Sequence, residues 1–234
     1  MSAPYFAVEG TPAGLKERLL RPSRTRWLDV GCGGNFEGGF EYLDIFSPEL
    51  VDPVDRRRYH CIDIANAPED ELRRLGLYDF VRMQHVLEHF TFEQAPEVLR
   101  RCGRLLEEGG WLLVTTPDLR INPQKYLSGQ YKTWNTYQQW ATQRIPHDAP
   151  ESCYFSIFAH SMPGEEHKWC YDYEGLAYQV QRAGEFEGVK EFKYGEPLSS
   201  YPYTHNRPEE DVCAIAQKKR PEVRPAGPGR PSVR

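Results

Sequence analysis

The sequence predicts an α/β fold built on an open, largely parallel β-sheet. Two observations support this prediction. Short apolar runs of strand type alternate along the chain with segments whose apolar residues recur at helical spacing. The first of these runs ends in a glycine-rich turn, which is where open α/β sheets bind their ligands. Strands that alternate with helices favour parallel pairing, because each helix carries the chain back to the same end of the sheet.

The composition is that of a globular protein with one large domain. The chain has 234 residues, of which 39% are apolar and 13% are aromatic, enough to bury a core. It has no apolar run near the ~18 residues of a membrane span, and its first ten residues lack the order of a signal peptide. The net charge of −5 argues against a nucleic-acid partner, because phosphate contacts need a clustered basic surface. We therefore expect a cytoplasmic protein that acts on a small molecule and contacts no membrane.

The elements are expected in a regular order. A helix is predicted over residues 11–20, where Thr11 and Pro12 form a start signal. Amphipathic spacing predicts a second helix from Ala95 to Leu106, with the glycine pair at 109–110 as its stop, and a third over 173–180 between Asp172 and Gly184. The predicted strands cover residues 27–30, 40–46, 59–64, 78–83, 111–115, 186–194 and 211–216. Residues 1–218 are expected to form the single domain, and the tail 219–234, rich in Pro, Gly and Arg, is expected to be disordered.

The glycine-rich turn reads Gly31-Cys32-Gly33-Gly34 and follows the first predicted strand directly. Glycine in this place lets the backbone approach a ligand closely. The dinucleotide fingerprint needs a further glycine where this chain has Phe36, and a phosphate loop needs a lysine and a hydroxyl that are absent. We therefore expect a ligand that is not held by its phosphates, with a plain tight turn as the alternative.

Three motifs in order, LDVGCGG, YDFVRMQHVLEHF and LLEEGGWLLVTTPDL, resemble those of the class I S-adenosylmethionine-dependent methyltransferases, in particular the type-11 branch. The stretch HKWCYDYEGLAYQVQRAG looks like a small subgroup of predicted methyltransferases. The resemblance covers roughly residues 26–218. It implies a Rossmann-like three-layer sandwich with a mostly parallel seven-stranded sheet and an antiparallel last strand. It also implies S-adenosylmethionine as the methyl donor and no need for a metal.

The resemblance also assigns cofactor contacts. Asp44, at the end of the second predicted strand, is expected to accept hydrogen bonds from the ribose hydroxyls, and Asp63 to receive the adenine amino group. The reverse assignment stays open, as does a role as a helix or turn cap. Asp29 is placed near the amino-acid end of the cofactor, and Gln84 and His85 beside its methionine portion. The predicted cofactor-binding residues are Asp29, Gly31, Cys32, Gly33, Asp44, Asp63, Ile64, Gln84 and His85.

Methyl transfer is an in-line displacement, so the protein mainly has to align the acceptor. An oxygen acceptor must also lose a proton, and imidazole titrates in the right range. The predicted catalytic residues are His85 and His167, with His89 and His160 as weaker candidates. His85 is expected closest to the methyl group, where it would either orient the nucleophile or deprotonate it. Packing or capping is the alternative role for the histidines of the HVLEH motif, and Glu88 is expected to anchor a helix.

Residues 120–173 are dense in aromatic side chains and are predicted to form an acceptor-binding lid inserted after the fifth strand. Trp134, Tyr154 and His167 are the predicted acceptor contacts. The alternative is a cap whose aromatic residues form a small core of their own. No metal site is expected, because the spacing of the histidines and cysteines in this region matches no zinc pattern. The six cysteines of the chain form no CxxC pair, so we expect reduced thiols.

The leading interpretation is an O- or N-methyltransferase that acts on a specialised metabolite or a saccharide. The motif after the fourth strand lacks the proline signatures of DNA-modifying relatives. Two alternatives remain: a non-catalytic methyltransferase-like binding module, against which the intact glycine turn and Asp44 count, and a methyltransferase for protein side chains. The sequence does not indicate an oligomeric state.

Overall fold

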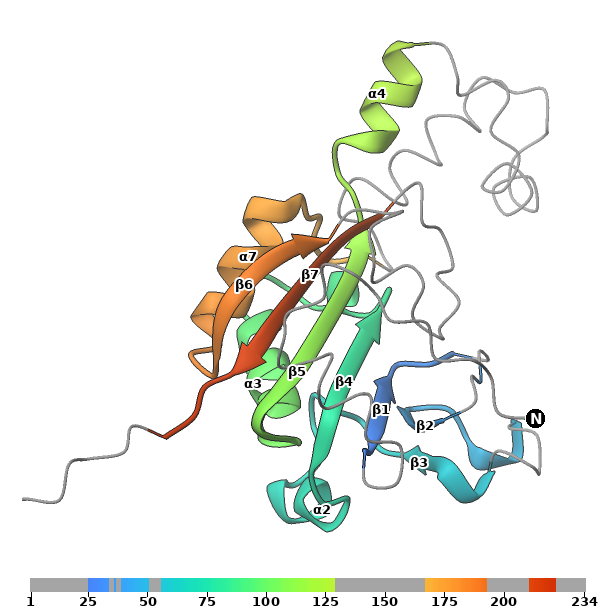
Figure 1. Ribbon diagram of the computed structural model, residues 1–234. Coiled ribbons are helices and arrows are strands. Elements are labelled where there is room, and N and C mark those ends of the chain that lie inside the picture. Colours follow the sequence, from blue (N-terminus) through green and yellow to red (C-terminus); the bar gives the residue numbers. More distant parts are fainter. Residues whose placement is uncertain are drawn as a thin grey trace, which may run out of the picture.

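The computed structural model describes residues 25–33, 36, 39–50, 56–128, 167–192 and 211–221. Seven strands form one sheet in the order β3-β2-β1-β4-β5-β7-β6 (Figure 1). The strands are β1 (Trp27–Val30), β2 (Phe40–Asp44), β3 (Tyr59–Cys61), β4 (Tyr78–Gln84), β5 (Leu106–Pro117), β6 (Phe186–Phe192) and β7 (Asp211–Lys218). β1 to β5 pair in parallel, and β7 runs antiparallel to both β5 and β6. The predicted α/β fold with a reversed last strand is therefore confirmed.

Four α-helices and three short 3₁₀ turns connect the described strands. The helices are α2 (Glu69–Arg74), α3 (Ala95–Arg104), α4 (Ile121–Leu127) and α7 (Tyr173–Arg182), and the turns are η1 (Pro48–Leu50), η2 (Arg56–Arg58) and η3 (Leu87–His89). As predicted, α7 begins after Asp172, whose carboxylate accepts a hydrogen bond of 2.8 Å from the N–H of Gly175. The described helices include none that is long and apolar enough to cross a bilayer. The predicted helix over 11–20 and tail residues 222–234 lie outside the described residues.

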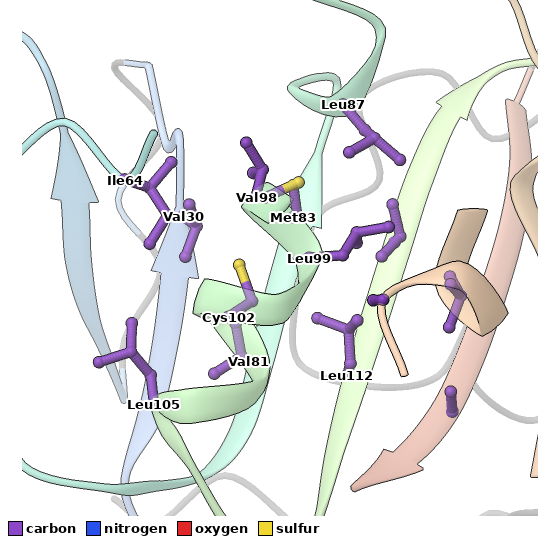
Figure 2. Packing of buried hydrophobic residues seen from close by; sticks show 14 of the residues in the cluster. Val30, Ile64, Val81, Met83, Leu87, Val98, Leu99, Cys102, Leu105 and Leu112 are labelled. Atoms are coloured by element: carbon purple, nitrogen blue, oxygen red, sulfur yellow. The ribbon is translucent and has the colours of Figure 1, made fainter. Parts of the chain in front are cut away.

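The sheet carries a separate apolar cluster on each face, because successive side chains of a strand point to opposite sides. Helices α3 and α7 lie against one face (Figure 1), and there Val98, Leu99 and Cys102 of α3 pack over Val81 and Met83 of β4 (Figure 2). The other face carries a largely aromatic cluster that includes Trp27, Phe40, Tyr42, Phe80 and Trp111. The apolar residues of the predicted strands are therefore divided between two packing layers, one on each face of the sheet.

β5 begins earlier than predicted. Helix α3 ends at Arg104 and β5 begins at Leu106, so the glycine pair 109–110 lies within the strand, and its prediction as a helix stop is wrong. Gly109 has a φ of 73°, and the register between β4 and β5 shifts between Tyr78 and Phe80. A glycine with positive φ at a register shift is typical of a β-bulge. The glycine pair thus lies at the bulge in β5 and does not end helix α3.

Glu41 of β2 joins three segments at the amino ends of β1 and β4. Its carboxylate accepts hydrogen bonds from Nη2 of Arg26 at 2.8 Å and from the hydroxyl of Tyr78 at 3.0 Å, and Nε2 of His60 lies 3.1 Å away. Burial alone would raise the pKa of Glu41, but the hydrogen bonds from Arg26, His60 and Tyr78 outweigh it and hold the pKa below 4.5. Glu41 is therefore a charged anchor at the end of the sheet opposite the glycine turn.

The segment after β5 leaves and rejoins the sheet at one place. Asp118 and Tyr171 form an isolated parallel bridge, and the N–H of Leu119 donates a hydrogen bond of 2.7 Å to the carbonyl of Tyr171. The predicted lid, residues 120–173, begins two residues after Asp118 and includes Tyr171. Of the lid, the structure describes α4 with its neighbours and residues 167–173, whereas Trp134, Tyr154 and His160 lie outside the described residues.

Candidate active site

A cavity of about 410 Å³ lies beyond the carboxyl ends of β1, β2, β3 and β4. This is the edge at which open α/β sheets bind ligands, and the volume is in the range of small-molecule sites. The cavity is lined by Val30, Gly31, Gly33, Leu43, Asp44, Ile45, Phe46, Ile62, Asp63, Ile64, His85, Val86, His89 and Phe90. Six of the nine predicted cofactor residues are among them: Gly31, Gly33, Asp44, Asp63, Ile64 and His85.

The two described glycines of the turn have different tasks. Both have positive φ, 72° at Gly31 and 62° at Gly33, a conformation that side chains disfavour. A Cβ at Gly31 would lie 2.2 Å from Cγ2 of Val86, so this glycine allows the turn to pack against the residue that follows His85. A Cβ at Gly33 would meet no atom of the described residues within 4 Å. Because Gly33 also lines the cavity, a ligand there can approach its backbone closely.

Asp44 ties the glycine turn to the end of β2. Its Oδ2 accepts a hydrogen bond of 2.8 Å from the N–H of Gly33, and its Oδ1 accepts one of 2.7 Å from the N–H of Ile45. The residue is only 7% exposed. Because a carboxylate can accept about four hydrogen bonds, each oxygen retains capacity for a ligand hydroxyl. Asp44 thus combines a structural role with an acceptor at the cavity wall.

Asp63 lies two residues beyond β3 and closes a local turn. Its Oδ1 accepts a hydrogen bond of 2.8 Å from the N–H of Ala65, and its Oδ2 accepts one of 2.7 Å from the side-chain amide of Asn66. The turn-cap alternative is therefore present in the structure. Asp63 also lines the cavity, so the turn holds its carboxylate in place beside any ligand there.

Asp29, Cys32 and Gln84 are not among the cavity-lining residues, and their cofactor contacts stay predictions. The carboxylate of Asp29 lies 2.6 Å from Nη2 of Arg82 in a buried ion pair. Burial raises the pKa of the Cys32 thiol to about 12, so the thiol stays protonated at neutral pH. The buried amide nitrogen of Gln84 makes no hydrogen bond within the part of the chain that the structure describes. The Gln84 amide thus offers a buried donor for a ligand.

His85 is held between two carboxylates at the cavity wall. Its Nε2 lies 2.8 Å from Oδ2 of Asp211, the first residue of β7, and its Nδ1 lies 3.3 Å from Oε1 of Glu88. Burial alone would lower the pKa of His85, but the interactions with Asp211 and Glu88 outweigh it and raise the pKa to about 10. Its φ of 53° is unusual for a residue other than glycine and is typical of functional sites. The two carboxylates therefore favour the protonated form of His85.

The fold brings His167 next to the motif after β4. The His167 and His89 rings are 5.0 Å apart at an interplanar angle of 87°, and His167 is 9% exposed. The N–H groups of Lys168 and Trp169 donate hydrogen bonds of 2.7 and 3.2 Å to the carbonyl of Glu88.

Asp211, which contacts His85, is a site residue that was not predicted from the sequence. The one feature of the sequence that could have indicated Asp211 is its position at the start of the last predicted strand.

Comparisons with known proteins identify the family of this chain. The profile of a family described as methyltransferase domain matches residues 8–184. The mitochondrial ubiquinone biosynthesis O-methyltransferase of Candida albicans is 29% identical over 144 residues, which cover 48% of this chain and 42% of that relative. The ubiquinone biosynthesis O-methyltransferase of Nitrosomonas europaea is 27% identical over 126 residues, or 49% of each chain. This chain thus spans less than half the length of either curated relative.

A solved structure shares the fold. The small RNA methyltransferase HEN1 aligns with a TM-score of 0.50 at 14% sequence identity, over 94% of this chain and 27% of that chain. The match over residues 8–184 includes the glycine turn, Asp44, Asp63 and the segment from Gln84 to His89. The chain therefore belongs to the methyltransferase domain family, within the class I S-adenosylmethionine-dependent methyltransferases.

Proposed function

We propose that this chain transfers the methyl group of S-adenosylmethionine to an oxygen or nitrogen atom of a small molecule, with a specialised metabolite or a saccharide as the acceptor. The observation that carries the proposal is the cavity beyond β1 to β4, where the turn at Gly33 and the carboxylates of Asp44 and Asp63 meet. A sulfonium methyl group is already activated, so this donor supplies the reactive carbon. The protein supplies binding and alignment.

The residues around the cavity suit the parts of this cofactor. Asp44 accepts hydrogen bonds from the ribose hydroxyls, and Asp63 accepts one from the adenine amino group. The open space at Gly33 admits the cofactor against the backbone. The buried amide of Gln84 donates to the methionine portion, because a buried donor without a hydrogen bond is otherwise costly.

Two roles are open to His85, to orient the acceptor's nucleophile or to deprotonate it, and we propose the first. A base must be able to accept a proton, whereas the interactions with Asp211 and Glu88 raise the pKa of His85 and favour its protonated form. We assign it the role of a positioning residue, whose fixed cation orients the acceptor at the cavity wall. His167 keeps its proposed place on the acceptor side, next to His89. Trp134 and Tyr154 remain proposed acceptor contacts.

Oxygen is the favoured acceptor atom. Both relatives described above are O-methyltransferases by name. The formal charge of −5 continues to favour a small acceptor over nucleic acid. We also propose that the reaction takes place in the cytoplasm as a biosynthetic step.

Calorimetry with S-adenosylmethionine and S-adenosylhomocysteine tests the cofactor, with Asp44→Asn as the weakened variant. Mass spectrometry after incubation with phenols, catechols, monosaccharides and amines then tests the transfer, and each methylated product should appear only with S-adenosylmethionine. Absence of binding to either cofactor form would refute the proposal. Tight binding without a product from any of the four acceptor classes would instead favour the non-catalytic binding module.

A further inference from the structure

Three potential metal ligands from two distant segments meet beside the cavity. Glu88 and His89 belong to η3, and His167 lies in the segment that leads to α7. One donor atom from each of these residues lies within 4.8 Å of the other two. The two backbone hydrogen bonds to the carbonyl of Glu88, from Lys168 and Trp169, fix the segments against each other. The cluster is therefore built into the fold.

The carboxylate of Glu88 is an independent sign of a missing ligand. Glu88 is 1% exposed, and neither of its oxygens accepts a hydrogen bond in the part of the chain that the structure describes. A buried carboxylate without hydrogen bonds is costly. The contact of 3.3 Å from Nδ1 of His85 to Oε1 offsets part of this cost, but a carboxylate has about four acceptor positions. A cation bound to the remaining positions would satisfy the group.

The donor types identify the kind of cation. Imidazole suits zinc, copper, iron and nickel, and carboxylate suits zinc and manganese, whereas calcium and magnesium sites are built from oxygen ligands. Three protein ligands leave positions open for water or a substrate, as in catalytic metal sites. His89 is exposed, so its ring can turn to shorten the remaining distance. One carboxylate and two neutral imidazoles would leave a divalent ion with a net positive charge.

We propose that Glu88, His89 and His167 bind a divalent transition-metal cation. Because His89 also lines the cavity, the ion stands at the cavity wall, where it can coordinate the acceptor's oxygen. This last placement rests on the proposed function, whereas the metal site does not. No metal was expected from the sequence, because its histidines and cysteines match no zinc spacing. These three ligands lie in separate motifs, and only the fold joins them.

Metal binding to the full chain tests the site directly. The chelator-treated protein is titrated separately with MnCl₂, CoCl₂ and ZnCl₂ by calorimetry, and the visible absorption of bound Co²⁺ reports its ligands. We expect one ion per chain, and at least tenfold weaker binding in His89→Gln and His167→Gln. His60→Gln is the matched control, since His60 pairs with Glu41 away from the cavity, and should bind as the wild type does.

Glu88→Gln should also weaken binding. Because Glu88 is buried, the circular dichroism of the Glu88→Gln variant is compared with that of the wild type. If this variant unfolds, His89→Gln still tests the site, because His89 is exposed. No saturable binding of any of the three ions, or equal weakening in His60→Gln, would overturn the proposal. Binding of S-adenosylhomocysteine is measured in parallel, so that failure of the metal site and failure of the proposed function give different results.

Discussion

Nε2 of His85 lies 2.8 Å from Oδ2 of Asp211, and this contact joins the end of β4 to the start of β7. Asp211 begins the antiparallel strand that completes the sheet between β5 and β6. The side chain at the cavity wall is therefore fixed by a strand that itself contributes no lining residue. A change at Asp211 should reach the acceptor through His85.

Replacing His85 should affect both stability and turnover. In His85→Gln, Asp211 and Glu88 lose a charged partner, and we expect the free energy of unfolding to fall by about 1.5–3 kcal/mol. Turnover should fall by up to about 10²-fold through misalignment, with little change in cofactor affinity. Chemical unfolding, steady-state kinetics and calorimetry measure the three quantities. Full stability together with full turnover would show that the contact with Asp211 has no role in the site.

The two glycines of the turn should respond differently to the same change. Gly31→Ala places a methyl group against Val86, so it should lower the melting temperature, and Val86→Ala should restore part of the loss. Gly33→Ala meets no atom of the described residues and should cost only about 1–2 kcal/mol for its positive φ. Gly33→Val should abolish cofactor binding in a folded protein, which calorimetry can test. Unchanged affinity in that variant would refute the placement of the cofactor at the turn.

Asp44 should contribute more to ribose recognition than Asp63. We expect Asp44→Ala to weaken cofactor binding by about 1.5–3 kcal/mol, the range for hydrogen bonds to a charged group. Asp63→Ala is the matched comparison, and a cofactor analogue that lacks a ribose hydroxyl identifies which variant has lost that contact. If only Asp63→Ala became insensitive to the missing hydroxyl, the ribose and adenine assignments would have to be exchanged.

Glu41 should make stability depend on pH below neutrality. Its pKa in the folded state lies below the ordinary value of 4.5, so its contribution is fully present above pH 4.5 and is lost as the pH falls through the folded-state value. Glu41→Gln should therefore be about 1–2 kcal/mol less stable than the wild type at pH 7, and this difference should shrink at lower pH. Unfolding curves from pH 3 to 7 measure it.

Glu69→Gln is the control for this experiment. Glu69 pairs with Arg104 at a more exposed position, where ion pairs contribute little, so its difference from the wild type should stay small at every pH. A difference for Glu41→Gln that did not change with pH would show that the charge of Glu41 has no part in the anchor.

The strands could be predicted because their apolar runs are short and end in clear turn residues. β1 has the predicted bounds, 27–30, and β4 extends one residue past its predicted end. Helix α2 was missed because Leu72 is its only buried residue, so it has almost no apolar periodicity to detect. The start of β5 was missed because a glycine pair looks the same in sequence whether it ends a helix or forms a bulge.

The candidate site was predictable where the residues lie at strand ends, as with Gly33, Asp44 and Asp63. It was not predictable where the direction of a side chain decides whether the residue reaches the cavity. Asp29 lies between Leu28 and Val30, which face the helices, so its own side chain points to the other face and meets Arg82. The group of Glu88, His89 and His167 depends on tertiary contacts that no spacing in the sequence records.

The bridge between Asp118 and Tyr171 makes the segment between them exchangeable. Because the chain leaves and rejoins the sheet at one point, the length of this segment does not constrain the strands, and each doubling of a loop costs only about 0.6 kcal/mol in closure entropy. A segment from a related enzyme, grafted in place of residues 129–166, should leave the cofactor cavity unchanged, because the contacts of His167, Lys168 and Trp169 with η3 are kept. Acceptor preference could then be engineered as a module, separately from the methyl-donor site.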